Sequence, residues 1–359
     1  MTETRIIHGW MMTGQGQPFE EGTIPIESIP PGEVLVEVAG CGVCHTDISF
    51  LHLGVKTRAE LPLVLGHEIS GTVVEVGEGV DGPMVGKQVL VPAVLPCGEC
   101  ELCRSGNLRI CRAQTMPGND RHGGFASHVV VPARYLCVVG NHVLADHELW
   151  ELAIVSDAIT TPFQAVQLSG LKEGDLAIFV GTGGIGIHGV QIAAAAGAKV
   201  IALDIDDQKL EVASNHGADA AINVSGLDLK EIRSAVKDTV AEIGAPRNLW
   251  KIFETSGVKA GQELAFSLMG FGSHLAVVGF TMDRLELRLS NLMAFDATAR
   301  GNWGSDPTIY PEVLEWIADG RIAVKPFIEK YPLAEINEVF NAAHEGKLLK
   351  RAVMVPGPA

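Results

Sequence analysis

The sequence has few positive charges for its size. Its 359 residues include 27 Lys and Arg against 43 Asp and Glu, which gives a formal net charge of −16. Proteins that follow a nucleic-acid backbone use clustered Lys and Arg to release counterions from the phosphates. The acidic balance therefore argues against nucleic acid as a partner.

Long apolar runs are also missing. No uninterrupted apolar stretch approaches the roughly 20 residues that a helix needs to span a bilayer. The opening residues, MTETRIIHGW, lack the basic segment and apolar core of a secretion signal. We therefore expect a cytoplasmic protein with no membrane partner.

Cysteine is sparse and unevenly placed. The chain has seven cysteines, an odd number, and four of them lie in one short segment: Cys97, Cys100, Cys103 and Cys111. This clustering fits a reducing compartment and metal binding better than a disulfide framework. The C-x2-C-x2-C-x7-C spacing can wrap four thiolates around one ion, which favours Zn, with an iron site as the redox alternative.

Four thiolates fill a tetrahedral coordination shell and leave no position for substrate, so we interpret this zinc as structural. A zinc-ribbon module that binds nucleic acid is the rival interpretation. Arg104, Arg109 and Arg112 lie in the same segment and would suit it, but the net charge of the chain argues against it.

The pattern of the chain changes near residue 176. Before it, short strands at 33–38, 71–76 and 88–91 alternate with Gly and Pro, which indicates a β-rich domain. After it, an apolar strand at 176–180, a Gly-rich turn, a helix and a second strand at 199–204 form a βαβ unit. Further strands at 220–224, 251–254 and 274–279 predict an α/β fold with a doubly wound parallel sheet.

The Gly-rich turn has the composition of a dinucleotide site. It comprises Gly181, Gly183, Gly184, Ile185 and Gly186, and Asp204 ends the next strand. Gly181 permits the tight turn, Gly183 lets the backbone approach a pyrophosphate, and Gly186 allows close helix packing. Asp204 can accept hydrogen bonds from both ribose hydroxyls and would repel a 2′-phosphate, so the turn predicts NAD rather than NADP.

Three further segments carry metal-ligand side chains. They are Cys44-His45-Thr46-Asp47, Gly66-His67-Glu68, and Asp157 within VSDAITTPFQAV. The run GHEISGTVVEVGEGV at 66–80 resembles the zinc signature of medium-chain alcohol dehydrogenases. The CGVCHTD segment, the cysteine cluster and the Gly-rich turn follow in that family's order, so the resemblance covers essentially the whole chain.

The resemblance implies a catalytic zinc bound by Cys44, His67 and Asp157, with Glu68 close enough to enter the coordination shell. Many relatives carry Cys where Asp157 stands, and others carry an acid. A harder ligand should make this zinc more Lewis acidic. The resemblance also implies a GroES-like catalytic domain at 1–152 and 300–359, and a Rossmann NAD-binding domain at 153–299.

The resemblance gives roles to the residues after Cys44. Asp47 is similar to the acid that orients the ligating histidine, which fixes its tautomer. Thr46 would accept the alcohol proton and pass it on. Relatives often end this relay with a histidine at the position of Ser49, so His52 or water is the expected outlet here.

Other expectations also follow from the resemblance. Lys209 matches the residue that supports the adenosine ribose, and Lys350 or Arg351 is expected at the pyrophosphate. A homotetramer or homodimer is expected, joined along the sheet edge near 279–289.

These features together predict an oxidoreductase that moves a hydride between a secondary alcohol or ketone and NAD. An open zinc position lowers the pKa of a bound alcohol, and the nicotinamide accepts the hydride. A zinc-free enone or quinone reductase is disfavoured, because such relatives lack both ligand sets. A cofactor-binding structural protein without turnover is the non-enzymatic alternative.

The substrate expectation rests on resemblance alone. The segments 45–68 and 156–166 resemble the 6-hydroxycyclohex-1-ene-1-carbonyl-CoA dehydrogenases of anaerobic aromatic degradation. This implies oxidation of a cyclic secondary alcohol, carried as a CoA thioester, to the 6-oxo compound; a general secondary or cyclic alcohol dehydrogenase is the alternative. The CoA phosphates would need local cations, for which the candidates are Lys56, Arg58, Arg121 and Arg300.

Overall fold

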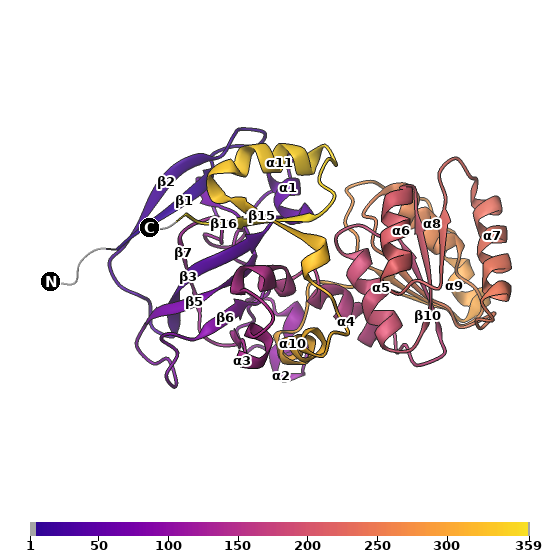
Figure 1. The fold of residues 1–359 in the computed structure, drawn as a ribbon, viewed down its shortest axis with the longest axis horizontal. Coiled ribbons are helices and arrows are strands. Elements are labelled where there is room, and N and C mark those ends of the chain that lie inside the picture. The colour runs from indigo at the N-terminus through magenta and orange to yellow at the C-terminus, as the bar shows by residue number, and fades with distance from the viewer. Residues whose placement is uncertain (1–4, 358–359) are drawn as a thin grey trace. The chain divides into compact units, whose positions relative to one another are not determined.

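The computed structural model describes residues 5–357 and divides into two units (Figure 1). The first unit comprises Met1–Thr160, Gly304–Asp319 and Ala323–Ala359, and the second comprises Thr161–Trp303 and Gly320–Ile322. Within the described residues, no helix is both long and apolar enough to span a membrane.

The first unit is built on two sheets. A seven-stranded sheet has the order β15-β16-β3-β5-β6-β8, with β7 also paired to β3, and a three-stranded sheet has the order β2-β1-β4. Its strands are β1 (Arg5–Met12), β2 (Glu20–Ile26), β3 (Glu33–Gly42), β4 (Leu63–Val64), β5 (Glu68–Val76), β6 (Gln88–Val91), β7 (His128–Pro132), β8 (Cys137–Val138), β15 (Ile328–Pro332) and β16 (Arg351–Val355).

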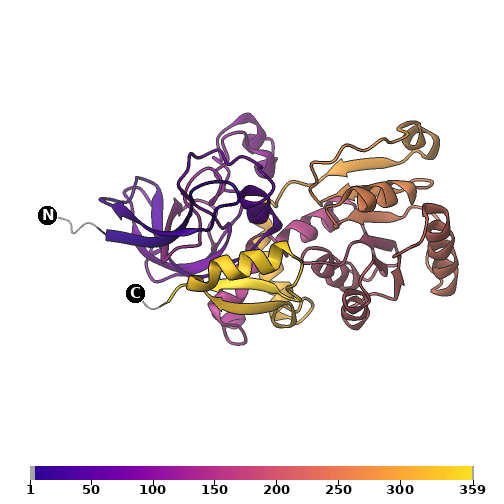
Figure 2. The same cartoon turned by 90° about the horizontal axis from the view of Figure 1, so that it is seen from above.

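Short helices connect these strands. The α-helices are α1 (His45–Leu51), α2 (Glu101–Arg104), α3 (Asn141–Leu144), α10 (Tyr310–Ala318) and α11 (Ile336–His344). The 3-10 helices are η1 (Leu108–Ile110), η2 (Leu149–Ser156), η3 (Pro307–Ile309), η4 (Lys325–Phe327) and η5 (Leu333–Glu335). Figure 2 shows the C-terminal segment, in yellow, lying beside the N-terminal strands, and β16 joins the sheet by pairing antiparallel to β3.

The second unit has a six-stranded, wholly parallel sheet in the order β11-β10-β9-β12-β13-β14. Its strands are β9 (Leu176–Val180), β10 (Lys199–Asp204), β11 (Ala220–Asn223), β12 (Lys251–Glu254), β13 (His274–Val277) and β14 (Thr298–Gly301). Its helices are α4 (Thr160–Leu168), α5 (Gly186–Ala195), α6 (Asp207–Asn215), α7 (Leu229–Glu242), α8 (Lys259–Ser267) and α9 (Ser290–Phe295).

The order of these strands is that of a doubly wound dinucleotide-binding sheet, and it reverses direction beside β9. Helices α5 and α6 pack together against β9, β10 and β11, and α7 packs with α8, which covers β12 and β13. Strand β9 is buried at every residue because it lies at the centre of the sheet. The predicted α/β fold class, a β-rich unit plus a parallel doubly wound sheet, is confirmed.

The division between the units differs from the sequence expectation. The first unit extends to Thr160, beyond the expected end at residue 152. Two hydrogen bonds explain this: Ser156 Oγ donates to Ile69 O of β5 at 3.0 Å, and Tyr310 Oη donates to Ser156 O at 2.5 Å. The segment that carries Asp157 is therefore held by the β-rich unit.

Candidate active site and cofactor turn

Strand register brings the first three candidate zinc ligands together. Strands β3 and β5 are antiparallel, and Gly42 at the end of β3 lies opposite Glu68 at the start of β5. Cys44 follows Gly42 by two residues, and His67 precedes Glu68 by one. These three residues are therefore neighbours in space because the strands beside them are paired.

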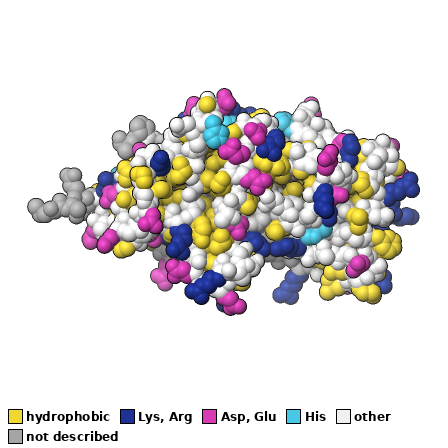
Figure 3. All heavy atoms as spheres, turned by 90° about the horizontal axis from the view of Figure 1, so that it is seen from below, with side chains coloured by type: hydrophobic (Ala, Val, Ile, Leu, Met, Phe, Trp, Pro, Cys, Tyr) yellow, Lys and Arg dark blue, Asp and Glu magenta, His cyan; other side chains and the backbone are white. Residues whose placement is uncertain are grey.

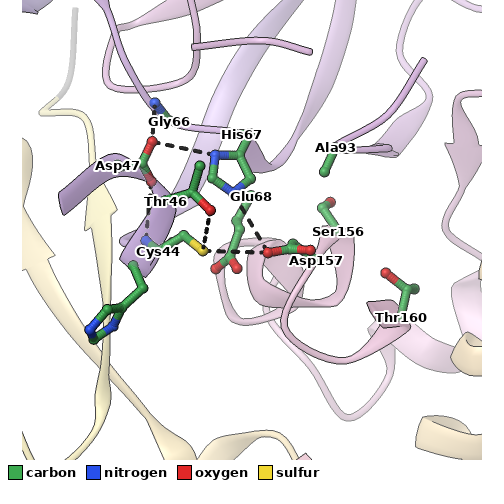
Figure 4. A network of polar contacts seen from close by, with 12 residues as sticks. Cys44, Thr46, Asp47, Gly66, His67, Glu68, Ala93, Ser156, Asp157 and Thr160 are labelled. Carbon is green, nitrogen blue, oxygen red and sulfur yellow. Dashed lines mark hydrogen bonds and ion pairs between the residues drawn. The ribbon is translucent and has the colours of Figure 1, made fainter. Parts of the chain in front are cut away.

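Asp157 completes this group. Cys44 Sγ lies 3.4 Å from Asp157 Oδ2, and His67 Nε2 lies 3.6 Å from the same oxygen (Figure 4). The donor atoms of Cys44, His67, Glu68 and Asp157 all lie within 4.8 Å of one another. Tetrahedral zinc with bonds of about 2.0–2.3 Å separates its ligand atoms by about 3.3–3.8 Å, so the arrangement fits the ion.

Asp47 anchors both sides of this group. Its Oδ2 accepts a hydrogen bond from the Cys44 amide at 3.1 Å, and its Oδ1 accepts one from the Gly66 amide at 3.1 Å. Oδ1 also lies 3.3 Å from His67 Nδ1, although the ring N–H is not aligned for a hydrogen bond. This placement suits a carboxylate that orients the histidine so that Nε2 faces the metal.

The electrostatics of the group favour a bound cation. Burial alone would lower the pKa of His67, but the Asp47 carboxylate and the neighbouring Cys44 raise it well above its ordinary value. Burial raises the pKa of the Cys44 thiol, and Asp157 raises it further. A dication at the centre would hold the thiolate and carboxylate ionised and the imidazole neutral.

Glu68 has a partner that the sequence did not reveal. Arg351 of β16 donates to both carboxylate oxygens, from Nε at 2.7 Å and from Nη2 at 2.5 Å, across 283 residues of sequence. Gly42 makes this contact possible, since a Cβ there would lie 2.1 Å from Glu68 Oε2. Burial raises the pKa of Glu68 to about 7, and Arg351 opposes that rise.

The contact with Glu68 is a role of Arg351 that the sequence did not predict. Its side chain is 9 % exposed and pairs with Glu68. The pyrophosphate contact expected of Lys350 or Arg351 stays a prediction, and Lys350 is exposed.

The predicted relay residues lie on and just after α1. Thr46 Oγ1 is 3.7 Å from Cys44 Sγ, and the buried Ser49 hydroxyl donates to His45 O at 2.8 Å. His52 follows the helix, and its ring stacks on His344 with centroids 4.3 Å apart. Its Nε2 is buried without a hydrogen-bond partner among the described residues.

The four-cysteine cluster forms a closed site. Four of its Sγ–Sγ distances lie between 3.5 and 3.9 Å, against about 3.8 Å for four sulfurs at 2.3 Å from one zinc. Backbone amides of Glu99 and Cys100 donate to Cys97 Sγ at 3.4 and 3.3 Å. Such contacts stabilise thiolates, and the Cys103 amide likewise lowers the pKa of Cys100 to about 6.

The two remaining cysteines do not join either ligand set. Cys41 is fully buried and Cys137 is 7 % exposed. Burial raises the pKa of Cys137 to about 12, so both thiols suit apolar packing rather than metal binding.

The Gly-rich turn after β9 has room where a phosphate is expected. A Cβ on Gly181 would lie 2.6 Å from Ser256 Cα, and one on Gly186 would lie 1.9 Å from Gly181 O. A Cβ on Gly183 would have no neighbour within 4 Å. Gly184 is exposed beside it, and Ile185, the N-cap of α5, offers no side-chain acceptor to the amides of the first turn. The turn is thus rigid at its ends and open in the middle, which fits a pyrophosphate.

Asp204 is fixed at the end of β10. Its Oδ2 accepts hydrogen bonds from the Thr182 amide at 2.7 Å and hydroxyl at 3.0 Å, and its Oδ1 accepts one from the Ile205 amide at 2.8 Å. Lys209 is exposed on α6, whose N-cap is Asp206. The carboxylate is therefore held beside the turn, as an acid that contacts a ribose must be.

Sequence reasoning missed the support beneath the turn. Thr255 Oγ1 donates to Gly181 O at 2.6 Å, and buried Glu254 accepts hydrogen bonds from Ser256 N and Oγ at 2.9 and 2.5 Å. These residues lie at the end of β12, the strand beside β9. Only the knowledge that β12 neighbours β9 would have shown their role.

Comparisons with known proteins agree with this geometry. The family model of the alcohol dehydrogenase GroES-like domain matches residues 30–141, and that of the zinc-binding dehydrogenases matches residues 184–319. An alcohol dehydrogenase of Geobacillus stearothermophilus is 34% identical over 90% of this chain and 91% of its own length. The chain belongs to the zinc-dependent medium-chain alcohol dehydrogenases. It is therefore an NAD-dependent zinc oxidoreductase of the alcohol dehydrogenase type.

Other relatives support the same assignment. An alcohol dehydrogenase of Moraxella sp. (strain TAE123) is 30% identical over 95% of this chain and 96% of its own length. The crystal structure of an alcohol dehydrogenase from Thermotoga maritima aligns with a TM-score of 0.87 and 25% identity, covering 98% of this chain and 100% of that chain.

Proposed function

We propose that this enzyme oxidises a secondary alcohol, or reduces the matching ketone, at a zinc held by Cys44, His67 and Asp157. The observation that carries the proposal is the convergence of one sulfur, one nitrogen and one carboxylate oxygen on a single point. When bound, zinc supplies Lewis acidity and NAD accepts the hydride. The Cys44 thiolate and the Asp157 carboxylate would balance the positive charge of the zinc, while Asp47 orients His67.

The test is turnover with NAD on a panel of secondary alcohols, compared between Cys44→Ser and Cys137→Ser. Both variants lose one buried thiol, but only Cys44 lies in the zinc group. Loss of turnover in Cys44→Ser with retention in Cys137→Ser supports the proposal. Equal turnover in both variants would remove the zinc group from the reaction.

Glu68 is proposed as a reserve ligand. Its carboxylate lies within the donor group but is held by Arg351. Movement of Glu68 onto the metal would require this ion pair to open. A zinc-edge X-ray absorption spectrum of Arg351→Met should then show an additional oxygen ligand, and a spectrum identical to that of the parent enzyme would refute the proposal.

We propose that Thr46 receives the alcohol proton and that His52 delivers it to solvent. Burial lowers the pKa of His52, and the nearby His344 lowers it further, so its ring is neutral and able to accept a proton. His52→Phe should shift the pH profile of kcat while leaving NAD affinity unchanged. An unchanged pH profile would assign the outlet to water.

The finer substrate assignment is a cyclic secondary alcohol carried as a CoA thioester. It rests on the sequence segments 45–68 and 156–166. Two of the four candidate cations are already paired, Arg58 with Asp120 at 3.1 Å and Arg121 with Glu33 at 2.7 Å, so Lys56 and Arg300 are the better candidates for the CoA phosphates. Equal catalytic efficiency for the free hydroxy acid and its thioester, at every salt concentration, would favour a general cyclic-alcohol dehydrogenase.

We also propose a cytoplasmic homodimer or homotetramer joined near residues 279–289. Large apolar side chains are exposed in and beside this segment, with Phe280 at 60%, Met282 at 64% and Leu289 at 67%. Such a patch is typical of a protein interface. A monomer by light scattering at micromolar concentration would contradict the proposal.

A further inference from the structure

The NAD-binding unit has a cavity at the opposite ends of its parallel strands from the cofactor turn. Gly181 and Asp204 lie at the carboxyl ends of β9 and β10, whereas the cavity lies before the amino ends of β12 and β13. Its volume is about 480 Å³, and its walls come from α7, residues 247–250, residues 268–271, Ser273 and Phe295. This volume is within the range of small-molecule sites.

The cavity is positively charged in an acidic protein. Arg233, Lys237 and Arg247 line it, and no Asp or Glu does. None of these three cations forms an ion pair within residues 5–357. Figure 3 shows dark blue Lys and Arg side chains close to yellow apolar ones at the end of this face where the NAD-binding unit lies. The charge therefore favours an anion.

The remaining walls are apolar and unusually exposed. Phe271 is 63% exposed and Leu249 is 60% exposed, while Trp250 beneath them is buried at 8%. Phe271 meets Phe295 edge to face, with ring centroids 5.4 Å apart. Large apolar side chains held at the mouth of a cavity are suited to an apolar ligand body.

Leu249 also has a backbone conformation that leucine rarely adopts. Its φ is +64°, and its amide donates to Phe271 O at 3.0 Å. Non-glycine residues in the left-handed region are strained and concentrate where function requires them. This conformation presents the Leu249 side chain at the cavity instead of burying it.

We propose that this cavity binds a small amphipathic anion, with a carboxylate or phosphate head on Arg247 and Lys237 and an alkyl or aromatic body against Leu249 and Phe271. The ligand is neither the cofactor nor the alcohol substrate, because the cofactor turn lies at the other ends of the strands and the zinc group lies in the other unit. The proposal therefore stands independently of the proposed catalytic function.

Calorimetric titration tests the proposal with decanoate and decyl phosphate as probes and the enzyme saturated with NADH. Saturable binding of at least one probe is expected, with no binding of decanol, which lacks charge, or acetate, which lacks the apolar body. Arg247→Gln combined with Lys237→Gln should raise the Kd of the bound probe by about tenfold, because charge-assisted hydrogen bonds are lost. Lys87→Gln, an exposed cation in the other unit, is the matched control.

Leu249→Gly provides a second variant that should fold, because glycine adopts a positive φ without strain. It removes part of the apolar wall and should weaken the binding of decanoate and decyl phosphate severalfold. Decanoate and decyl phosphate affinities unchanged in both the charge variant and Leu249→Gly would overturn the proposal. Equal affinity for decanol would overturn it as well.

Discussion

Replacement of Arg351 by Met should destabilise the catalytic unit strongly. The change leaves the Glu68 carboxylate, which is fully buried, without its two hydrogen-bond donors at 2.7 and 2.5 Å. Removing one partner of a buried ion pair costs about 3–5 kcal/mol, because the remaining charge is uncompensated. For a unit of this size, each kcal/mol lowers Tm by about 2–4 °C, so a loss of about 10 °C is expected.

Differential scanning calorimetry of the NAD-free protein measures this loss, with the zinc at Cys44, His67 and Asp157 removed by chelation so that Glu68 has no metal to bind. Lys350→Met is the matched control, since the neighbouring Lys350 is exposed and the substitution removes the same charge. The double variant Arg351→Met/Glu68→Gln should recover more than half of the lost Tm, because glutamine is neutral. Equal Tm values for Arg351→Met and Lys350→Met would refute the reasoning.

Three further predictions follow from the described geometry. Cys103→Ser should lower soluble yield and thermal stability sharply, because a structural zinc site contributes folding free energy directly, whereas Cys137→Ser should be mild; a stable, zinc-replete Cys103→Ser protein would refute the closed site. Asp204→Ala should weaken the binding of NAD by about tenfold and allow NADP to bind, as measured by the Kd of each dinucleotide. An unchanged preference for NAD over NADP would exclude Asp204 from the site. Gly186→Ala should abolish NAD binding while Gly183→Ala weakens it less, because a Cβ on Gly186 would lie 1.9 Å from the backbone oxygen of Gly181, whereas a Cβ on Gly183 has no neighbour within 4 Å. Equal NAD affinities of the two variants would show the turn to be pliable.

Local signals predicted most of the fold. Strand β6 at Gln88–Val91 and strands β9, β10 and β12 begin and end where the sequence placed them. These strands combine short apolar runs with polar, Gly or Pro residues at their ends, so neighbouring residues alone carry the information. Strand β14 was missed because it has only four residues, TARG, which are all exposed and include no large apolar side chain.

The contacts of the site were harder to predict. The cysteine cluster is predictable because its four ligands lie within one loop and their spacing alone defines the site. The ion pair between Glu68 and Arg351 depends on β16 returning to β3, and on Gly42 lying between the two side chains. Tertiary pairing of this kind leaves no periodic signal in the sequence, so the contact between Arg351 and Glu68 was not predicted.

Zinc content of the purified chain tests the central claim most directly. Elemental analysis should give two zinc ions per chain, because the structure forms two separate donor groups. Asp157→Ala should retain the structural zinc and the NAD affinity of the parent enzyme, lose the other zinc, and lose alcohol oxidation. One zinc in the parent protein, or full turnover by Asp157→Ala after its second zinc is lost, would contradict a catalytic zinc at Cys44, His67 and Asp157.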